Sequence, residues 1–270
     1  GVISVAGLKL TDLAEQVGTP AYVIDEEDFR ARARAWRQAF AGWTVYYAGK
    51  SFLCTTIARW VAEEDLSLDV CSLGELTVAL RAGFDPARLG MHGNNKSEAE
   101  LRLGLASGVG RIIIDSADEI GRLERLCAEL DTTAQVMVRV TTGVEAHTHE
   151  YIATAHEDQK FGFSISGGQA LVALVRCYHS PRLNLVGIHS HIGSQIFDTN
   201  GFEVAARRTL KLMAQFKEAT GTALGELDLG GGFGIAYTKE DDPAGPEVLA
   251  AGLREIVDHE CRGFGLDVPA

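Results

Sequence analysis

Polar residues and glycines that can take part in chemistry follow seven short apolar segments of this sequence. In enzymes built on a barrel of parallel strands, catalytic groups lie at the carboxyl ends of the strands, so residues in such positions are expected to meet. An amine, carboxylates, histidines and a glycine run together are suited to holding an anionic ligand around a lysine. These residues are Lys50, Asp69, residues 92–96, Asp115, Arg139, residues 189–194 and residues 228–234.

Lys50 is the residue of this set that could react covalently with a carbonyl group. It comes just after the apolar segment 44–48, so we expect its stem at the rim of a barrel, with its amine partly removed from water. Removing an ammonium from water favours the neutral amine, whose lone pair is needed for a Schiff base. The alternative is an ordinary solvated lysine, which is what most lysines are.

Gly230, Gly231 and Gly232 precede a helical pattern and could bring successive backbone N–H groups onto a phosphate. Glycine permits this approach because it has no side chain between the backbone and the ligand. A plain turn is an equally common use of a glycine triplet. The run therefore indicates a phosphate site only in combination with other motifs.

His189 and His191 lie two residues apart on an expected strand, so their side chains point to the same face. His191 could place its ring against a flat heterocycle or act as an acid or base, and an ordinary buried histidine is the plain alternative. The pair also suits a metal ion. A metal-dependent barrel hydrolase that uses His189, His191 and a third ligand is therefore a second hypothesis.

The apolar segments alternate with amphipathic helical patterns, which is typical of repeated βα units around a parallel sheet. The repeat favours an α/β fold with a (β/α)₈ TIM-type barrel over an open doubly wound sheet, without excluding the latter. Ser116 and Glu119 are expected to form a capping box at the start of one helix. The expected strands are 44–48, 66–71, 88–91, 111–115, 135–141, 185–190 and 226–229, and the expected helices are 56–64, 74–82, 97–107, 116–130, 168–179, 202–220 and 247–261.

Seven strands are one too few for a closed barrel, and the sequence stops where the eighth is expected. We therefore interpret residues 41–270 as a barrel that is incomplete at its carboxyl end, and the chain as a fragment. Residues 1–40 do not follow the βα rhythm. A short strand at 21–24 and an arginine-rich helix at 26–40 indicate a leader that partly belongs to a second domain.

The connection at residues 143–162 is long, polar and rich in histidine. Long excursions of this kind over a strand end are often active-site lids. A surface insertion without a role is the alternative.

The sequence has 25 Lys and Arg against 37 Asp and Glu, a net charge of -12. This charge repels phosphate backbones and anionic lipid faces, so we expect neither nucleic acid nor a membrane as partner. Five scattered cysteines without a C-x-x-C pair indicate neither a disulfide framework nor a thiolate zinc site. With no secretory signal visible, a cytoplasmic protein is expected.

Five motifs occur in a fixed order along the chain. They are residues 46–50 (YYAGK), 68–75 (LDVCSLGE), 92–96 (HGNNK), 189–195 (HSHIGSQ) and 228–233 (DLGGGF). Together they resemble the pyridoxal-phosphate enzymes of the alanine-racemase-like barrel type, and most closely the diaminopimelate decarboxylases. The segment 145–162 looks like the actinobacterial branch of that family, and the resemblance extends from Gly18 to the end of the chain.

The resemblance implies a role for individual residues. Lys50 matches the lysine that is covalently joined to pyridoxal 5'-phosphate, and His191 matches the histidine stacked on the cofactor ring. Ser194, Gly230, Gly231 and Gly232 match the phosphate-binding elements. Asp69, Glu75 and Arg139 match polar residues around the lysine, and we include Asp69 and Arg139 in the cofactor-binding site; no metal ion is implied. An alanine or similar residue is expected where Gly49 stands, which we take as a mild change.

The resemblance also implies parts that this sequence does not contain. These are a Glu-Pro-Gly-Arg segment and a C-terminal β-domain that donates a cysteine across a dimer interface. We therefore expect a homodimer whose active site is completed by the partner's C-terminal domain, and a 270-residue fragment that by itself can be inactive.

The implied reaction is the decarboxylation of meso-diaminopimelate to L-lysine and CO2, the last step of lysine biosynthesis. The choice of substrate does not follow from residue types. Ornithine, arginine and carboxynorspermidine decarboxylases of the same fold, and a cofactor-binding protein without turnover, therefore stay open as alternatives.

Overall fold

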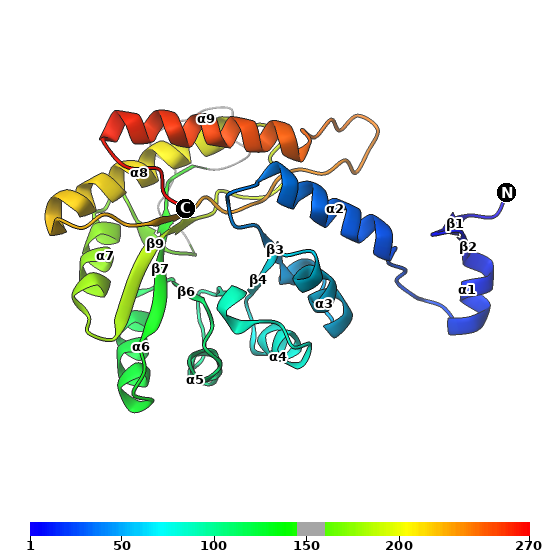
Figure 1. Cartoon of the computed structure of the whole chain (residues 1–270), viewed down its shortest axis with the longest axis horizontal. Helices are drawn as coiled ribbons and strands as arrows, with labels where there is room; N and C mark the ends of the chain where they lie inside the picture. The colour runs from blue at the N-terminus through cyan, green and yellow to red at the C-terminus, as the bar shows by residue number, and fades with distance from the viewer. Residues whose placement is uncertain (145–159) are drawn as a thin grey trace.

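A curved parallel sheet forms the centre of the computed structural model, which describes residues 1–144 and 160–270. Seven strands lie in the order β3-β4-β5-β6-β7-β9-β10, so each strand of this path is added beside the preceding one (Figure 1). In a doubly wound sheet, the direction in which successive strands are added would instead reverse at a switch point. The (β/α) barrel prediction is therefore confirmed. The strands are β3 (Tyr46–Ala48), β4 (Ser67–Val70), β5 (Leu89–Met91), β6 (Arg111–Ile114), β7 (Ala134–Thr141), β9 (Leu183–Ser190) and β10 (Glu226–Asp228), with β8 (Phe163–Ser164) paired to the end of β7.

Helices surround the outside of this sheet (Figure 1). All seven helices expected around the barrel are present, with ends that differ by at most three residues from the expected ones. No helix of the described ranges 1–144 and 160–270 is both long and apolar enough to cross a bilayer. The helices are α2 (Glu26–Ala39), α3 (Thr55–Glu63), α4 (Leu73–Arg81), α5 (Glu98–Ser107), α6 (Ala117–Glu129), α7 (Gln169–His179), α8 (Asn200–Thr220) and α9 (Pro246–Phe264), with short 3-10 turns at Gly49–Ser51 and Pro86–Arg88.

Strand β7 shows how the pattern of side chains places polar groups inside the barrel. Val136, Val138 and Val140 are buried and belong to the apolar core beneath the helices. Successive residues of a strand point to opposite faces, so Met137 and Arg139 face the inside of the curved sheet. The outward valines drive the packing, and the inward positions are left for polar chemistry.

The sheet curls strongly enough for strands three places apart in its order to face each other. Arg111, at the start of β6, donates to Glu226, at the start of β10, with N–O distances of 2.7 and 2.5 Å. Within the described residues β3 and β10 are the two edges and are not paired with each other. The seven strands therefore form an open, barrel-like sheet in which an ion pair across the interior joins β6 to β10.

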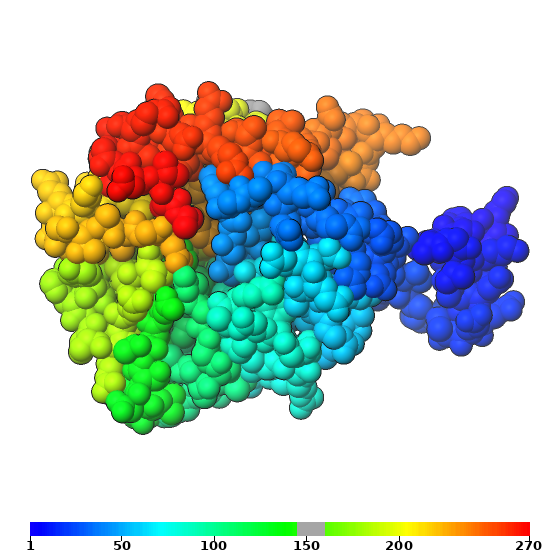
Figure 2. Space-filling model, in the orientation of Figure 1, coloured from blue at the N-terminus to red at the C-terminus, as the bar shows by residue number. Residues whose placement is uncertain are grey.

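The amino-terminal segment projects away from the barrel (Figures 1 and 2). It consists of β1 (Ser4–Val5), β2 (Leu8–Lys9) and α1 (Leu10–Val17), and α1 contains no buried residue. The predicted strand at 21–24 is wrong: these residues are exposed and have no strand partner among the described residues. An extended segment becomes a strand only when a neighbour accepts its backbone hydrogen bonds.

Helix α2 packs on the barrel, to whose core it contributes Ala33. It is joined to the end of α3 by the ion pairs of Arg30 with Glu63 and Glu64. The assignment of residues 1–40 to a second domain stays a prediction.

Three serines begin helices that follow strands and thereby fix the connections at the carboxyl edge. The side chains of Ser72, Ser97 and Ser116 each accept the N–H three residues later. The full capping box lies at Ser97 and Glu100, whereas the one predicted at Ser116 is wrong in its second half. The carboxylate of Glu119 accepts the N–H of Asp115 instead, and it also binds a buried lysine.

Candidate active site

The carboxyl ends of β3, β4, β9 and β10 bring the predicted residues to one mouth of the barrel. The charge of Lys50 lowers the pKa of His191 and that of Asp69 raises it, so the three side chains lie within range of one another's charges. A Cβ on Gly230 would lie 2.9 Å from Nδ1 of the same ring. These four residues lie far apart in sequence but meet because parallel strands end at the same edge.

Lys50 occupies the 3-10 turn that follows β3. The turn is held by Ser51, whose hydroxyl donates to the carbonyl oxygen of Ala48 at 2.8 Å, and by the hydroxyl of Tyr47, which donates to the carbonyl of Phe52 at 2.9 Å. The expected partial removal of Lys50 from water is wrong for this structure, because Lys50 is exposed at the rim. The amine is therefore accessible to a ligand at the mouth.

Gly49 stands where the family has alanine or a similar residue, a change that the sequence alone suggests is mild. In the structure, however, the space around Gly49 is tight. The residue is buried, and an added Cβ would lie 2.6 Å from the carbonyl oxygen of Asp69. This distance requires a shift of the backbone. The close contact of β3 with β4 next to Lys50 thus depends on glycine at this position.

His191 presents an uncharged ring at neutral pH. Burial lowers its pKa to about 4, and the positive charges of Lys50 and Arg139 act in the same direction. A neutral, flat imidazole can lie against a heterocycle without adding a charge. It is not a proton donor at neutral pH, which favours the predicted stacking over acid catalysis.

The predicted phosphate-binding glycines differ from one another in their surroundings. The N–H of Gly230 donates to Oδ1 of Asp228 at 2.7 Å, so this group does not point freely to a ligand as expected. A Cβ on Gly232 would overlap the carbonyl oxygen of Gly193. Beside Gly231, in contrast, no described atom other than those of its chain neighbours lies within 4 Å of the Cβ position. Open space therefore exists at the middle glycine, with two closely packed glycines around it.

The loop after β9 carries Ser194 and is joined to the glycine loop by backbone pairing. The N–H of Ile196 donates to the carbonyl of Gly232 at 2.9 Å, and the N–H of Gly234 donates back to Ile196 at 2.8 Å. The side chain of Gln195 exchanges two hydrogen bonds of 3.1 Å with the backbone of Ile235. Ser194 is exposed. Because these hydrogen bonds join its loop to the glycine loop, the position of Ser194 depends on that of the glycines.

A cluster of titratable side chains lines the inside of the barrel below this mouth. His92 lies with Nε2 3.1 Å from Oδ1 of Asp69, and its ring meets that of His189 edge-on with 4.9 Å between the ring centroids. Burial opposes protonation of His92, but Asp69 outweighs it and raises the pKa. Burial lowers the pKa of His189 well below its ordinary value.

Asp228 belongs to the same cluster. Burial, with the charge of Asp69, raises its pKa to about 6. His92 and Asp228 were named among the strand ends but not as site residues. The signal that could have found them was their place at the carboxyl ends of the expected strands 88–91 and 226–229.

Arg139 lies inside the barrel, with its guanidinium over the ring of Phe161 at 4.3 Å and its Nε 3.9 Å from Oδ1 of Asp115. Burial lowers its pKa. The side chain of Asn94 donates to the carbonyl of Lys160 at 3.3 Å. The predicted lid at 143–162 lies mostly outside the described residues, and these contacts involve only its described carboxyl end.

The metal hypothesis requires three ligands in one place. Within residues 1–144 and 160–270 no three His, Cys, Asp or Glu side chains are arranged to hold a metal ion. His189 is buried against His92, while His191 lies past the end of β9.

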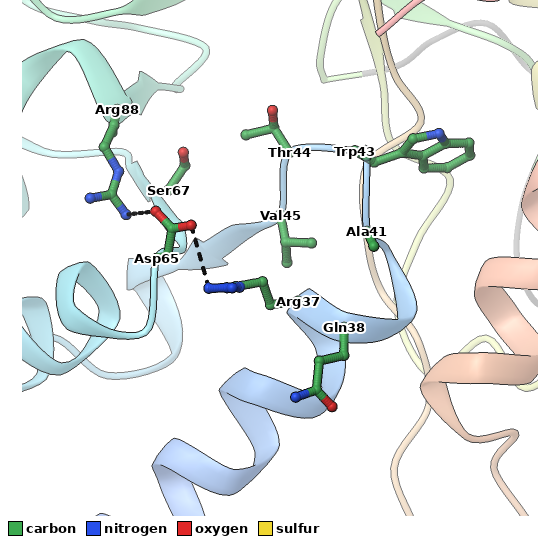
Figure 3. A pocket seen from close by; sticks show the side chains of 10 residues that line it. Arg37, Gln38, Ala41, Trp43, Thr44, Val45, Asp65, Ser67 and Arg88 are labelled. Carbon is green, nitrogen blue, oxygen red and sulfur yellow. Dashed lines mark hydrogen bonds and ion pairs between the residues drawn. The ribbon is translucent and has the colours of Figure 1, made fainter.

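A cavity of about 560 Å³ lies away from this mouth (Figure 3). It is lined by residues that precede β3, β4 and β5, among them Thr44, Asp65 and Arg88. Asp65 forms ion pairs there with Arg37 and Arg88 (Figure 3). The amino ends of barrel strands generally serve stability and not catalysis, so we do not assign the reaction to this cavity.

The residues at the mouth fit pyridoxal 5'-phosphate. An exposed amine is available for the aldehyde, a neutral ring for the pyridine, and open space beside Gly231 for the phosphate. Ser190 is fully buried, and its hydroxyl has no partner among the described residues. The donor set therefore matches a flat anionic aldehyde.

Comparison with known proteins agrees with this site. A family model described as "Pyridoxal-dependent decarboxylase, pyridoxal binding domain" matches residues 26–268. A diaminopimelate decarboxylase of Mycobacterium leprae is 54% identical over all of this chain and 58% of its own length. The enzyme of that name from Bacillus subtilis is 43% identical over all of this chain and 62% of its own length. The chain thus spans about three fifths of these relatives.

A solved structure of diaminopimelate decarboxylase from M. jannaschii in complex with L-lysine superposes with a TM-score of 0.91 at 29% identity. The match covers all of this chain and 63% of that one. Family model, sequence relatives and fold agree, and pyridoxal 5'-phosphate is the cofactor they imply. The chain therefore belongs to the pyridoxal-dependent decarboxylases and comprises their pyridoxal-binding domain.

Proposed function

We propose that the protein carrying this chain decarboxylates meso-diaminopimelate to L-lysine and CO2. The observation that carries the proposal is 43–54% identity, along the whole chain, to proteins named diaminopimelate decarboxylase. The convergence of Lys50, His191 and the glycines at one mouth supports it. Bound pyridoxal 5'-phosphate supplies an electron sink for the pair released when a carboxylate leaves as CO2.

The chain's own residues bind and orient. Lys50 would hold the cofactor through its amine, which is exposed at the mouth. His191 would lie against the cofactor ring and orient it. Ser194 and the glycine loop would bind the phosphate, chiefly beside Gly231, where the space is open.

Asp69 and Arg139 complete the cofactor site in this proposal. Asp69 lies 3.1 Å from Nε2 of His92, and its negative charge also acts on His191, where it opposes the effect of the nearby cations. Arg139 contacts the ring of Phe161 and pairs with Asp115 inside the barrel, so its charge is held in place. Charges held in place before the ligand binds need no reorganisation during the reaction.

We further propose, on the resemblance alone, a cytoplasmic homodimer in which the partner's C-terminal domain completes the active site. Light scattering of the full-length protein tests the dimer. A monomer that turns over substrate at full rate contradicts it.

Release of CO2 from meso-diaminopimelate, compared with L-ornithine and L-arginine, tests the reaction in the full-length protein. Preference for another amino acid overturns the substrate assignment.

Borohydride reduction of the holoenzyme followed by peptide mass analysis tests the site, and we expect the cofactor mass on Lys50. Lys50→Ala removes the label and the activity, whereas Lys217→Ala, which changes an exposed lysine of α8, retains both.

A further inference from the structure

A carboxylate that the proposed function does not use lies at the base of the glycine loop. Asp228 is the last residue of β10 and is in register with His189 of β9. Its Oδ1 accepts the N–H of Gly230 at 2.7 Å and so closes a tight turn over one intervening residue. Gly230 has a φ of +74° there, a conformation that favours glycine. The hydrogen bond holds the first glycine in this turn.

The turn closed by Asp228 also supports the ring of His191. A Cβ on Gly230 would lie 2.5 Å from the carbonyl oxygen of Ser190 and 2.9 Å from Nδ1 of His191. The backbone of Gly230 thus packs directly against the end of β9. A movement of this glycine would change the space available to the imidazole.

The loop that carries Ser194 depends on the same anchor. Its backbone pairs with Gly232 and Gly234 through Ile196, so it moves with the glycine loop. A fixed Gly230 therefore sets the position of both predicted phosphate-binding elements. Among the described residues, Asp228 is the side chain that forms a hydrogen bond with Gly230. This bond holds the two loops from within the barrel.

The charge of Asp228 is costly where it lies. Charged groups on three other strands or strand ends face it, namely Asp69 on β4, His92 after β5 and Arg139 on β7. Burial and Asp69 disfavour the ionised form, whereas His92 and Arg139 favour it. An amide could accept the same N–H without this cost, although a charged acceptor binds an N–H more strongly than a neutral one.

We propose that Asp228 is a positioning residue that holds the glycine loop and His191 in the geometry needed to bind the phosphate and ring of the cofactor. This inference rests on the proposed function, because it assumes that pyridoxal 5'-phosphate occupies the mouth. Asp228 does not touch the cofactor in this proposal. It acts through Gly230.

The test measures the affinity of the full-length apoprotein for pyridoxal 5'-phosphate and for pyridoxal, which lacks the phosphate. Asp228→Ala is expected to weaken binding of pyridoxal 5'-phosphate by roughly tenfold or more, as expected for the loss of a charge-assisted hydrogen bond. Binding of pyridoxal should weaken less, so the preference for the phosphate shrinks. Asp228→Asn keeps an acceptor for Gly230 and should recover part of that preference.

Asp241→Asn is the matched control. Asp241 lies in the same β10–α9 loop and accepts the N–H groups of Tyr237 and Thr238 at 2.9 and 2.8 Å, but away from the barrel interior. Its variant should keep both affinities. Equal weakening of both ligands in Asp228→Ala, or no weakening, overturns the inference.

If Asp228→Ala does not fold, the asparagine variant decides. A reduced preference for the phosphate supports the inference, and an unchanged preference overturns it. Failure of the proposed function looks different, because the wild-type protein would then show no cofactor bound at Lys50 after borohydride reduction. That result overturns the inference as well.

Discussion

Replacing Lys96 by methionine tests how far the mouth of the barrel depends on one buried ion pair. Nζ of Lys96 donates to Glu119 at 2.7 Å and to the carbonyl oxygens of Gly93 and Ile113 at 2.9 and 2.5 Å. The two side chains are 2% and 4% exposed, so neither can turn to water when the other is lost. Burial lowers the pKa of Lys96 although Glu119 opposes this.

Removal of one partner of a buried ion pair generally costs about 3–5 kcal/mol. Folded proteins of ordinary size are stable by about 5–15 kcal/mol, so Lys96→Met should remove about a fifth or more of the total. Glu119→Gln should cost less, because glutamine keeps an oxygen for the N–H of Asp115. The double variant should be more stable than the sum of the single effects predicts, because it leaves no unpaired charge in the interior.

Equilibrium unfolding in denaturant of the wild type, both single variants and the double variant measures this coupling. Arg102→Met is the control, since Arg102 pairs with Glu98 on the exposed surface of α5 and should shift the unfolding midpoint much less. Additivity of the two single effects within about 0.5 kcal/mol would refute the reasoning, because coupled neighbours are expected to deviate by more.

Three further predictions concern the mouth itself. Asp228 has a pKa raised from 3.8 to about 6, so its contribution to stability is complete below pH 3.8 and is lost as the pH rises through about 6. This corresponds to up to about 3 kcal/mol at 1.36 kcal/mol per pKa unit, and the apoprotein with Asp228→Asn should not show this loss when unfolding is measured across that range. His191, with a pKa lowered to about 4, should remain neutral above about pH 5.5 in an NMR titration of labelled imidazoles, and a midpoint near the ordinary 6.5 contradicts its burial. Gly231→Ala should leave the unfolding free energy unchanged or raise it by up to about 1 kcal/mol, since nothing obstructs the added methyl. The same variant should weaken binding of pyridoxal 5'-phosphate roughly tenfold, and an unchanged affinity would place the phosphate elsewhere.

The barrel could be predicted from the sequence because its signals are local. Short apolar segments rich in branched side chains, such as the one in β6, alternate with amphipathic helices, and each of the seven expected strands is present. The segment 21–24 has similar residues and is not a strand, because no neighbour pairs with it. Strand formation is decided by the partner, which a short sequence window does not contain.

The site was predicted in part for the same reason. Positions after strands identified Lys50, Asp69, His191 and the glycines, which the structure brings to one mouth. The expected burial of Lys50 was wrong, since exposure depends on which other segments cover the rim.

The sequence by itself determined which chemical groups stand at the ends of the strands, because residue type and period-two alternation are properties of the chain. Only the tertiary structure decided that Asp228 binds Gly230, that Glu119 binds Lys96 instead of completing a cap, and that Gly231 faces open space. Side-chain hydrogen bonds and free volume depend on distances between strands and loops after the sheet has curled. These distances are set by the packing of the whole barrel.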